Sequence, residues 1–405
     1  MHLGCQSESS LSTRHVRRKL FASESELDCP VSRSIAEEET ARSSSNFVRV
    51  NMAGTVCTGW SAAGKGLHFA DPSERPHAIW ASERVARAEQ GLEDFMISEC
   101  TPRYPVQEKL SALENTHDVF SIVLSPMMLG WPVRRTRVFT CALNRETMAW
   151  FGPPASEISA HFMQFFERSV ATTGDICLAA NDAEVRAYLC EMARKRGFEL
   201  PENVPLENVQ LHHIYAPGQM VRLQSYEQDR QRHLAETVEV DHAAVGALSA
   251  VDAGPSAWFA DLEQNLGQGA STPSEMLPSA LTHGTLHAWS ANRPVLPMEQ
   301  FLAHGFNVFP DRSKWKRACL MTDALSDFSS CQQKKLLGNG WHLPVIASWM
   351  FYIMAHTVKL DRSVSIQPER TLLRKGGSSF SIGQGSSTPD LSLAADSQDA
   401  SVQDE

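Results

Sequence analysis

The feature that most restricts the fold is a strand-like run followed by a glycine-rich loop, a helix and a second strand. The run FVRVNMA (47–53) alternates apolar and polar residues, as a half-buried strand does. It leads into the glycine-rich loop AGTVCTGWSAAGKGL (53–67). The segment SERVARAEQGLED (82–94) predicts a helix, and FMISE (95–99) predicts a short strand. This order predicts a βαβ unit, whose parallel strands end at the same edge of a sheet.

The glycine-rich loop permits two interpretations. From Gly59 it reads G-W-S-A-A-G-K-G, close to the phosphate-binding sequence G-x-x-x-x-G-K-[ST]. That sequence needs a final hydroxyl to bind Mg²⁺, and Gly66 stands there instead, which argues against a nucleotide site. From Gly54 the loop sets Cys57 among small residues, as expected for a reactive thiol with an acid–base partner nearby.

Other polar groups are expected at the same edge of the sheet as Cys57. Glu99 ends the second strand of the βαβ unit. DVFSIVLS (118–125) and RVFTCAL (137–143) predict two further strands, and Arg135 lies two residues before Arg137, so both side chains share a face of an extended segment. A thiol, a carboxylate and two guanidinium groups suit nucleophilic attack on a polar, electron-poor ring.

Composition narrows the class of protein. The chain has 405 residues, 42% of them hydrophobic and 21% charged, which predicts a soluble, intracellular globular protein with one large or two smaller domains. No signal peptide or membrane span is evident. Nine scattered cysteines without a C-x-x-C predict neither a disulfide framework nor a zinc site, and no other metal site is predicted. Because the net charge is −10, any surface of the protein that binds nucleic acid must be a local group of basic residues.

Five blocks of this sequence occur in the order seen in the cytosine-5 DNA methyltransferases, and the chain resembles that family. The blocks are TVCTGWSAAGKG, FMISECTPRYP, GWPVRRTRVFTCAL, SANRPVLPMEQFLAHGF and LLGNGWHLPVIASW, within residues 47–356. The resemblance implies that Cys57 attacks C6 of a flipped cytosine and that Glu99 contacts N3. It also implies that Arg135 and Arg137 are the family's paired arginines, with Arg137 at the base's O2.

The two C-terminal blocks imply further roles. By resemblance, Gly338, Asn339 and Gly340 begin a helix that completes the pocket for the methyl donor, S-adenosylmethionine. Arg293 matches an arginine that is structural or close to DNA in the family. The implied partner is DNA, with no membrane and no metal, and the implied location is the nucleus; a basic run, RHVRRKL (14–20), reads as an import patch or a solvated charge run.

The sequence departs from the family pattern at several places. Val56 and Thr58 replace the family's Pro and Gln on either side of the cysteine, Cys100 replaces the Asn after Glu99, and Val133 replaces a Gln. The family's glycine-rich F-x-G-x-G strand and loop has no counterpart among the residues before Phe47. The expected sheet therefore lacks its N-terminal strands.

The resemblance implies an α/β fold: a Rossmann-like methyltransferase sheet, N-terminally incomplete, with an antiparallel hairpin at one edge and a smaller irregular target-recognition domain. The expected parts are a disordered tail (1–45), a catalytic α/β domain (46–145), a target-recognition region (146–285), the C-terminal part of the catalytic domain (286–361) and a second disordered tail (362–405). Three functions remain open: a DNA cytosine-5 methyltransferase, an inactive or truncated DNA-interaction protein, and a tRNA cytosine-5 methyltransferase.

Overall fold

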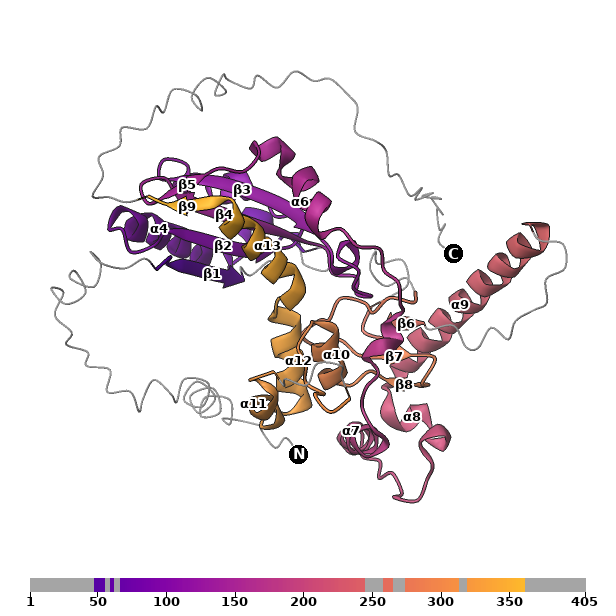
Figure 1. Ribbon diagram of the computed structural model, residues 1–405. Coiled ribbons are helices and arrows are strands. Elements are labelled where there is room, and N and C mark those ends of the chain that lie inside the picture. The colour runs from indigo at the N-terminus through magenta and orange to yellow at the C-terminus, as the bar shows by residue number, and fades with distance from the viewer. Residues whose placement is uncertain are drawn as a thin grey trace, which may run out of the picture. The chain divides into compact units, whose positions relative to one another are not determined.

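In the computed structural model, four strands form one mixed sheet in the order β1-β2-β4-β3 (Figure 1). They are β1 (Val50–Gly54), β2 (Phe95–Cys100), β3 (His117–Leu124) and β4 (Arg137–Asn144). β1 and β2 are parallel, whereas β4 runs antiparallel to both β2 and β3. The predicted βαβ unit and the antiparallel hairpin at one edge are both confirmed.

The structure describes residues 47–54, 59–61, 66–244, 258–264, 274–312 and 319–360. Cys57 and both predicted disordered tails lie outside these residues. Within them, no helix combines the length and the apolar character needed to cross a bilayer.

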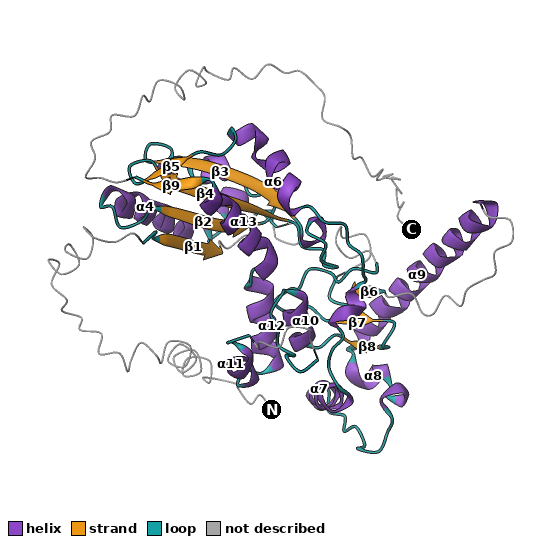
Figure 2. Cartoon of the chain, in the orientation of Figure 1, coloured by secondary structure: helices purple, strands orange, loops and turns teal. Residues whose placement is uncertain are grey.

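Each face of the sheet is covered by different helices (Figure 2). On one face, Phe95 and Ile97 pack with α13 (Leu343–Ala355) and α6 (Ile158–Phe166) in the largest apolar cluster. On the other face, Met96 packs against Trp80 of α4 (Glu74–Glu89). The C-terminal helix thus packs back on the sheet, because α13 is apolar enough for one side of it to be buried there.

Helix α4 begins eight residues earlier than the sequence indicates. The residues before position 82 continue the helix, and Ser82 lies inside it, with its hydroxyl donating to the carbonyl of Ala78 over 3.0 Å. The helix is anchored to the sheet by Trp80, whose indole N–H donates to Asn51 of β1 over 3.3 Å. A serine inside a helix can bond back to residue i−4, so its presence alone does not mark a helix start.

The end of the described chain returns to the sheet region. α13 stops at Ala355, and the residues that follow form β9 (Thr357–Lys359) rather than more helix. β9 pairs antiparallel with β5 (Met148–Trp150). The Lys359 ammonium group donates to the carbonyl oxygen of Phe47 and lies 3.5 Å from the Asp94 carboxylate, which ties the two ends of the described chain together.

Most of the regular elements described in the predicted target-recognition region and in the segment after it are helices. Their elements are α7 (Asp182–Lys195), α8 (Leu211–Ile214), α9 (Pro217–Ala244), a sheet of β6 (Phe259–Asp261), β7 (Leu286–Ala288) and β8 (Arg293–Pro294), then α10 (Pro297–Ala303), α11 (Thr322–Ser326) and α12 (Ser330–Asn339). A short helix, α5 (Val106–Lys109), follows β2.

Candidate active site

The candidate site lies where β1 and β2 end. In the parallel ladder Gly54 is paired with Glu99, so the last residues of the two strands lie side by side. Cys57 follows Gly54 by three positions and belongs to the part of the chain that the structure does not describe. The structure therefore describes the part of the predicted site that contains Glu99, and it describes β1, the strand that precedes the loop of Cys57.

Glu99 is joined to both predicted arginines. Its Oε1 lies 2.9 Å from Nε of Arg137 and 3.9 Å from Nη2 of Arg135. The carboxylate is buried, with Glu99 only 7% exposed. The two arginines reach Glu99 because β4 runs antiparallel to β2. β4 begins at Arg137, so Arg137 and the residues just before it lie near the end of β2. The structure thus brings Glu99, Arg135 and Arg137 together, as predicted.

The environment of Glu99 favours its protonated form. Burial raises the pKa of the carboxyl group, and the positive charges of Arg135 and Arg137 oppose this without outweighing it. A carboxyl group that keeps its proton to a higher pH can donate a hydrogen bond or a proton to a ring nitrogen. This is the role that the resemblance implies for Glu99.

The two arginines differ in what else they contact. Arg135 donates to the carbonyl oxygens of Gly340, at 2.7 Å, Gly338, at 3.4 Å, and Ala280, at 3.4 Å, and to the hydroxyl of Ser279, at 3.3 Å. Its side chain is 3% exposed, so it joins the sheet to the helical segment inside the protein. Arg137 has an 18% exposed side chain and, among the residues that the structure describes, donates to the backbone carbonyl of Thr136 besides its ion pair with Glu99. Of the pair, Arg137 is the arginine that a substrate can contact.

The Gly338–Gly340 segment ends a helix rather than beginning one, which corrects the prediction. Gly338 and Asn339 form the last turn of α12, Gly340 follows it, and α13 begins only at Leu343. A side chain at Gly338 would place its Cβ 2.3 Å from the backbone nitrogen of Thr282, so the glycine allows two backbones to pack closely.

The residues predicted to bind S-adenosylmethionine lie beside the end of β1. The carbonyl oxygens of Gly338 and Gly340 accept hydrogen bonds from Arg135. Asn339 is exposed, and its carbonyl oxygen lies 4.0 Å from where a Cβ on Gly54 would be; the indole nitrogen of Trp341 lies 3.1 Å from the same point. The binding of the donor by these residues stays a prediction.

Arg293 is buried in an ion pair. Its two terminal nitrogens donate to the two carboxylate oxygens of Glu299 over 2.8 and 2.7 Å, and Glu299 is fully buried. The same carboxylate accepts the backbone N–H groups of Leu296 and Ala180, so the pair holds the start of α10 against the segment before α7. This arrangement favours the structural role of Arg293; its contact with DNA stays a prediction.

The described part of the glycine-rich loop is packed, and its geometry differs from a nucleotide cradle. Trp60 stacks on His68, with ring centres 4.6 Å apart, and its indole N–H donates to Glu74 over 3.1 Å. The next α-helix starts at Glu74, eight residues after Gly66. A phosphate cradle instead leads directly into the N-terminus of its helix.

Two buried histidines that the sequence analysis overlooked lie beside Arg135. His304 and His342 are each 2% exposed, and their ring centres lie 6.0 Å apart. Burial lowers the pKa of both rings, that of His304 to about 3, and the charge of Arg135 adds to the effect. Both stay neutral at physiological pH and act as part of the packing behind the site. His342 lies between the Gly338–Gly340 segment and the apolar α13. A polar residue next to an apolar helix is the feature of the sequence that could have identified it.

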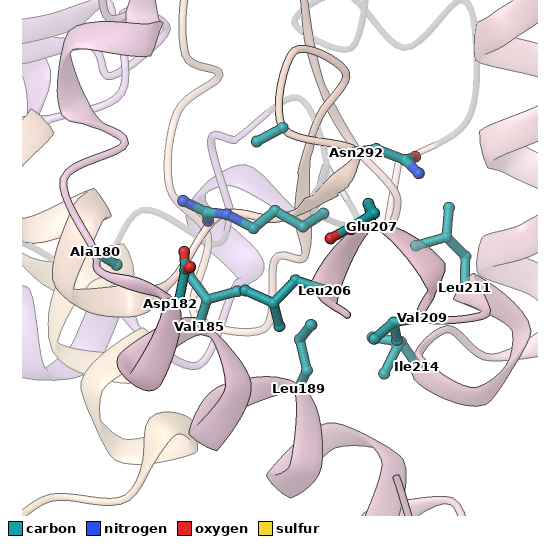
Figure 3. Close-up of a pocket in the computed structure, with 12 residues that line it drawn as sticks. Ala180, Asp182, Val185, Leu189, Leu206, Glu207, Val209, Leu211, Ile214 and Asn292 are labelled. Carbon is teal, nitrogen blue, oxygen red and sulfur yellow. The ribbon is translucent and has the colours of Figure 1, made fainter. Parts of the chain in front are cut away.

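A cavity of about 300 Å³ lies apart from the Glu99 cluster and shares no residue with it (Figure 3). Val185, Leu189 and Ile214 from α7 and α8 form its buried apolar wall, whereas the exposed Asp182 and Glu207 lie at its rim. Arg293, which is paired with Glu299, also lines the cavity, so groups of both charges face it.

Comparison with known proteins gives weak likenesses to methyltransferases. No family model and no curated protein matches the sequence. Among solved structures, the chain is similar to the methyltransferase EhMeth of Entamoeba histolytica, with 13% identity, a TM-score of 0.40 and coverage of 84% of this chain and 87% of that one. It is also similar to a mutant DNMT2 of Spodoptera frugiperda (12%, TM-score 0.37, 84% and 88%) and to the Dnmt2 methyltransferase of S. pombe (12%, TM-score 0.38, 76% and 77%). All three of these structures are of methyltransferases, and two of them are named DNMT2 or Dnmt2.

Proposed function

We propose that this chain is a DNA (cytosine-5-)-methyltransferase whose candidate site activates a cytosine base for methylation at C5. The observation that carries the proposal is the buried Glu99, held by Arg135 and Arg137 at the end of β2, beside the strand that leads to Cys57. Three residues of chain span about 10 Å, so a thiol at position 57 is able to reach a base held at Glu99.

The chemistry begins at C6 of the cytosine ring. The thiolate of Cys57 forms a bond to C6, the electrons of the C5–C6 double bond form a C4–C5 double bond, and the electrons of the C4–N3 double bond move onto N3, which takes the proton of Glu99. C5 thereby becomes the nucleophilic carbon of an enamine. Arg137 donates to O2 and holds the ring in place, and the base must first leave its helix, which costs a few kcal/mol.

The base-activating half of this reaction can be tested without a methyl donor. The enamine takes a deuteron at C5 from D₂O, and loss of the original hydrogen and of the thiolate returns a labelled cytosine. We expect mass spectrometry to detect label in mixed-sequence DNA duplexes incubated with the chain. The label should vanish with Cys57→Ala and fall at least about 100-fold with Glu99→Gln. Wild-type protein that labels neither DNA nor RNA would refute the proposal.

S-adenosylmethionine is the methyl donor that the proposal implies, and its binding is a separate question. Isothermal titration of the donor into the chain, with and without DNA, measures it directly. Exchange without donor binding would identify this chain as a base-binding protein that does not methylate alone.

RNA is the alternative substrate, because thiol addition and base flipping serve RNA equally well. RNA oligonucleotides of the same sequences, incubated in the same exchange assay, distinguish the two. Label confined to RNA would replace the DNA proposal by its RNA counterpart.

A further inference from the structure

Trp60, in the described part of the glycine-rich loop, packs beside the residues that adjoin the candidate site. It lies against a small buried cluster of three side chains, Cys100, Tyr104 and Val138. Cys100 directly follows Glu99 in β2, and it is paired in register with Val138, the residue after Arg137 in β4. The indole ring therefore lies against the two strand ends that carry Glu99 and Arg137.

Glu74, the first residue of α4, binds the same indole ring through its N–H group. This N–H group of Trp60 donates to Oε1 of Glu74 over 3.1 Å. The second carboxylate oxygen of Glu74 accepts from the ammonium group of Lys109, whose side chain is only 5% exposed. That ammonium group also lies 5.6 Å from the centre of the Phe69 ring, which meets Trp60 edge-on with ring centres 5.0 Å apart. One oxygen of Glu74 is thus bound to the loop and the other to a buried cation.

The partners of Glu74 connect the loop to the chain that leaves β2. Lys109 is the last residue of α5, the short helix that follows β2. Tyr104, between β2 and α5, is hydrogen-bonded through its hydroxyl group to Nε2 of His77 in α4. The start of α4 is therefore fixed by the segment that follows Glu99, and the indole of Trp60 is fixed by the start of α4.

The loop end at Gly59 and Trp60 limits where Cys57 can lie. The carbonyl oxygen of Gly59 accepts the backbone N–H group of His68 over 3.1 Å, and Gly59 is buried. Position 57 is three residues from Gly54 and two from Gly59. The chain alone keeps it within about 10 Å of the first glycine and about 7 Å of the second. A shift of Gly59 and Trp60 is therefore passed on to the thiol.

We propose that Trp60 and Glu74 are positioning residues, whose hydrogen bond sets the place of the Cys57 thiol relative to the Glu99 carboxyl group. The inference rests on the proposed function and adds to it the residues that align its two reacting groups. The thiol attacks C6 while the carboxyl group protonates N3 of the same ring, so both must be aligned at once. A displacement of about 1 Å costs up to about 100-fold in rate.

The first test is C5 deuterium exchange in duplex DNA. Trp60→Phe removes the indole N–H group but keeps an aromatic ring, and Glu74→Ala removes the acceptor. Each should lower the maximal exchange rate by about 10-fold with the KM for DNA unchanged. The double variant should lose no more than the larger single loss, because all three lack the same hydrogen bond. Glu74→Gln keeps an acceptor oxygen and should retain most of the rate.

The second test measures the position of the thiol without any catalysis. In a Glu99→Cys background, dibromobimane, a short reagent that joins two thiols, should link Cys57 to position 99. Peptide mapping identifies the joined pair. Trp60→Phe or Glu74→Ala, added to this background, should slow the cross-linking by about 10-fold, because the loop end is no longer held by its hydrogen bond.

Asp118→Ala is the matched control, because it breaks an ion pair at the other end of the sheet. Asp118 lies 2.6 Å from Arg145 and is paired in register with Leu143, whereas Glu99 is paired with Phe139. The control should change neither the exchange nor the cross-linking. Circular dichroism establishes that each variant is folded before the rates are compared.

Cross-linking that proceeds at the same rate with and without the hydrogen bond would overturn the proposal, as would the lack of any link between Cys57 and position 99. A double variant whose loss of exchange is the product of the two single losses would also overturn it. If the wild type labels no nucleic acid but both substitutions still slow the cross-linking, the proposed function fails and the positioning of the loop stands.

Discussion

At the scale of single residues, the two arginines of the site, which have one residue between them, play different roles. Arg135 is buried and donates to carbonyls of the segments around Ala280 and Gly340. Arg137 is partly exposed and holds the Glu99 carboxylate at 2.9 Å. The first arginine positions the helical segment behind the site, and the second is placed to meet a substrate. Substitutions at the two positions should therefore have different effects.

Arg135→Gln should lower the free energy of unfolding by about 3 kcal/mol, because it leaves buried carbonyl oxygens without a donor. Arg137→Gln should lower it by less, since Glu99 keeps Arg135 as a second partner and the side chain of Arg137 is partly exposed. The same Arg137→Gln variant should nevertheless lose C5 deuterium exchange. Urea unfolding and the exchange assay measure the two quantities. Equal losses of stability would contradict this division of roles.

Arg293→Met should be strongly destabilising, by about 3–5 kcal/mol, because it leaves the buried carboxylate of Glu299 without its counter-charge. The double variant with Glu299→Leu should recover part of the loss, since it removes the unpaired charge as well. Urea unfolding of the wild type and the two variants forms the comparison. If the single variant were as stable as the wild type, the ion pair would not have the structural role assigned to it.

At the scale of elements, the junction between α12 and α13 joins the helical segment to the sheet. Gly338 packs against the backbone at Leu281 and Thr282, and Trp341 packs beside Gly54. The junction stands behind the Glu99 cluster because Arg135 donates to carbonyls at both of its glycines. Close backbone packing at this junction is therefore a requirement for the geometry of the site.

Gly338→Ala should lower the melting temperature by several degrees, since its Cβ would lie 2.3 Å from the nitrogen of Thr282 and force α12 away from it. Gly218→Ala is the control. It lies in the first turn of α9, and the nearest atom to its added Cβ is 3.8 Å away. Alanine there should be neutral or stabilising by up to about 1 kcal/mol. Thermal unfolding followed by circular dichroism compares them; the same shift in both would disprove the packing argument.

At the scale of the whole molecule, neutral histidines are distributed through the interior. His117 and His287 are 0% and 1% exposed, and His304 is also buried. Burial lowers the pKa of His287 and His304 to about 3 and that of His117 to about 4. Each of these rings must give up hydration to become charged in the folded state, whereas it charges freely in the unfolded chain.

The chain should therefore lose stability as the pH falls below about 6.5, since the unfolded state takes up protons there and the folded histidines do not. The folded pKa values are depressed, so this contribution is complete above pH 6.5 and declines towards about 3. His287→Gln should lessen the loss between pH 6.5 and 4.5, by on the order of 1–2 kcal/mol. Urea unfolding at several pH values measures it; an unchanged pH slope would exclude His287 as a source of acid sensitivity.

Local sequence patterns were sufficient for the sheet and for part of the site. The short apolar runs in FMISE and RVFTCAL gave the correct strands, and both strands are buried on both faces of the sheet. The position of Glu99 at a strand end, and of Arg135 two residues before Arg137, placed the three groups near one another, as the structure shows. These inferences succeeded because strand geometry depends on neighbouring residues.

Features that depend on contacts between residues far apart in the sequence could not be predicted from local sequence patterns. Long α9 has a mostly polar sequence, and Ser82 resembled a helix start although it lies inside α4. Gly338 and Gly340 were predicted to begin a helix, whereas Gly338 lies in the last turn of α12 and Gly340 follows it. The structural role of a glycine depends on which groups contact it. Here the contacting groups lie far away in the sequence.

Local patterns were therefore sufficient for the order of the strands along the chain, their mixed α/β class and the residue types at the candidate site. The folded structure was needed to show which arginine is buried, that Arg293 is paired with Glu299, and that apolar side chains such as Phe351 of α13 are exposed. The difference arises from how far apart in the sequence the interacting residues are. Strand and helix patterns reflect neighbours in sequence, whereas burial, ion pairing and exposed surface depend on segments brought together by folding.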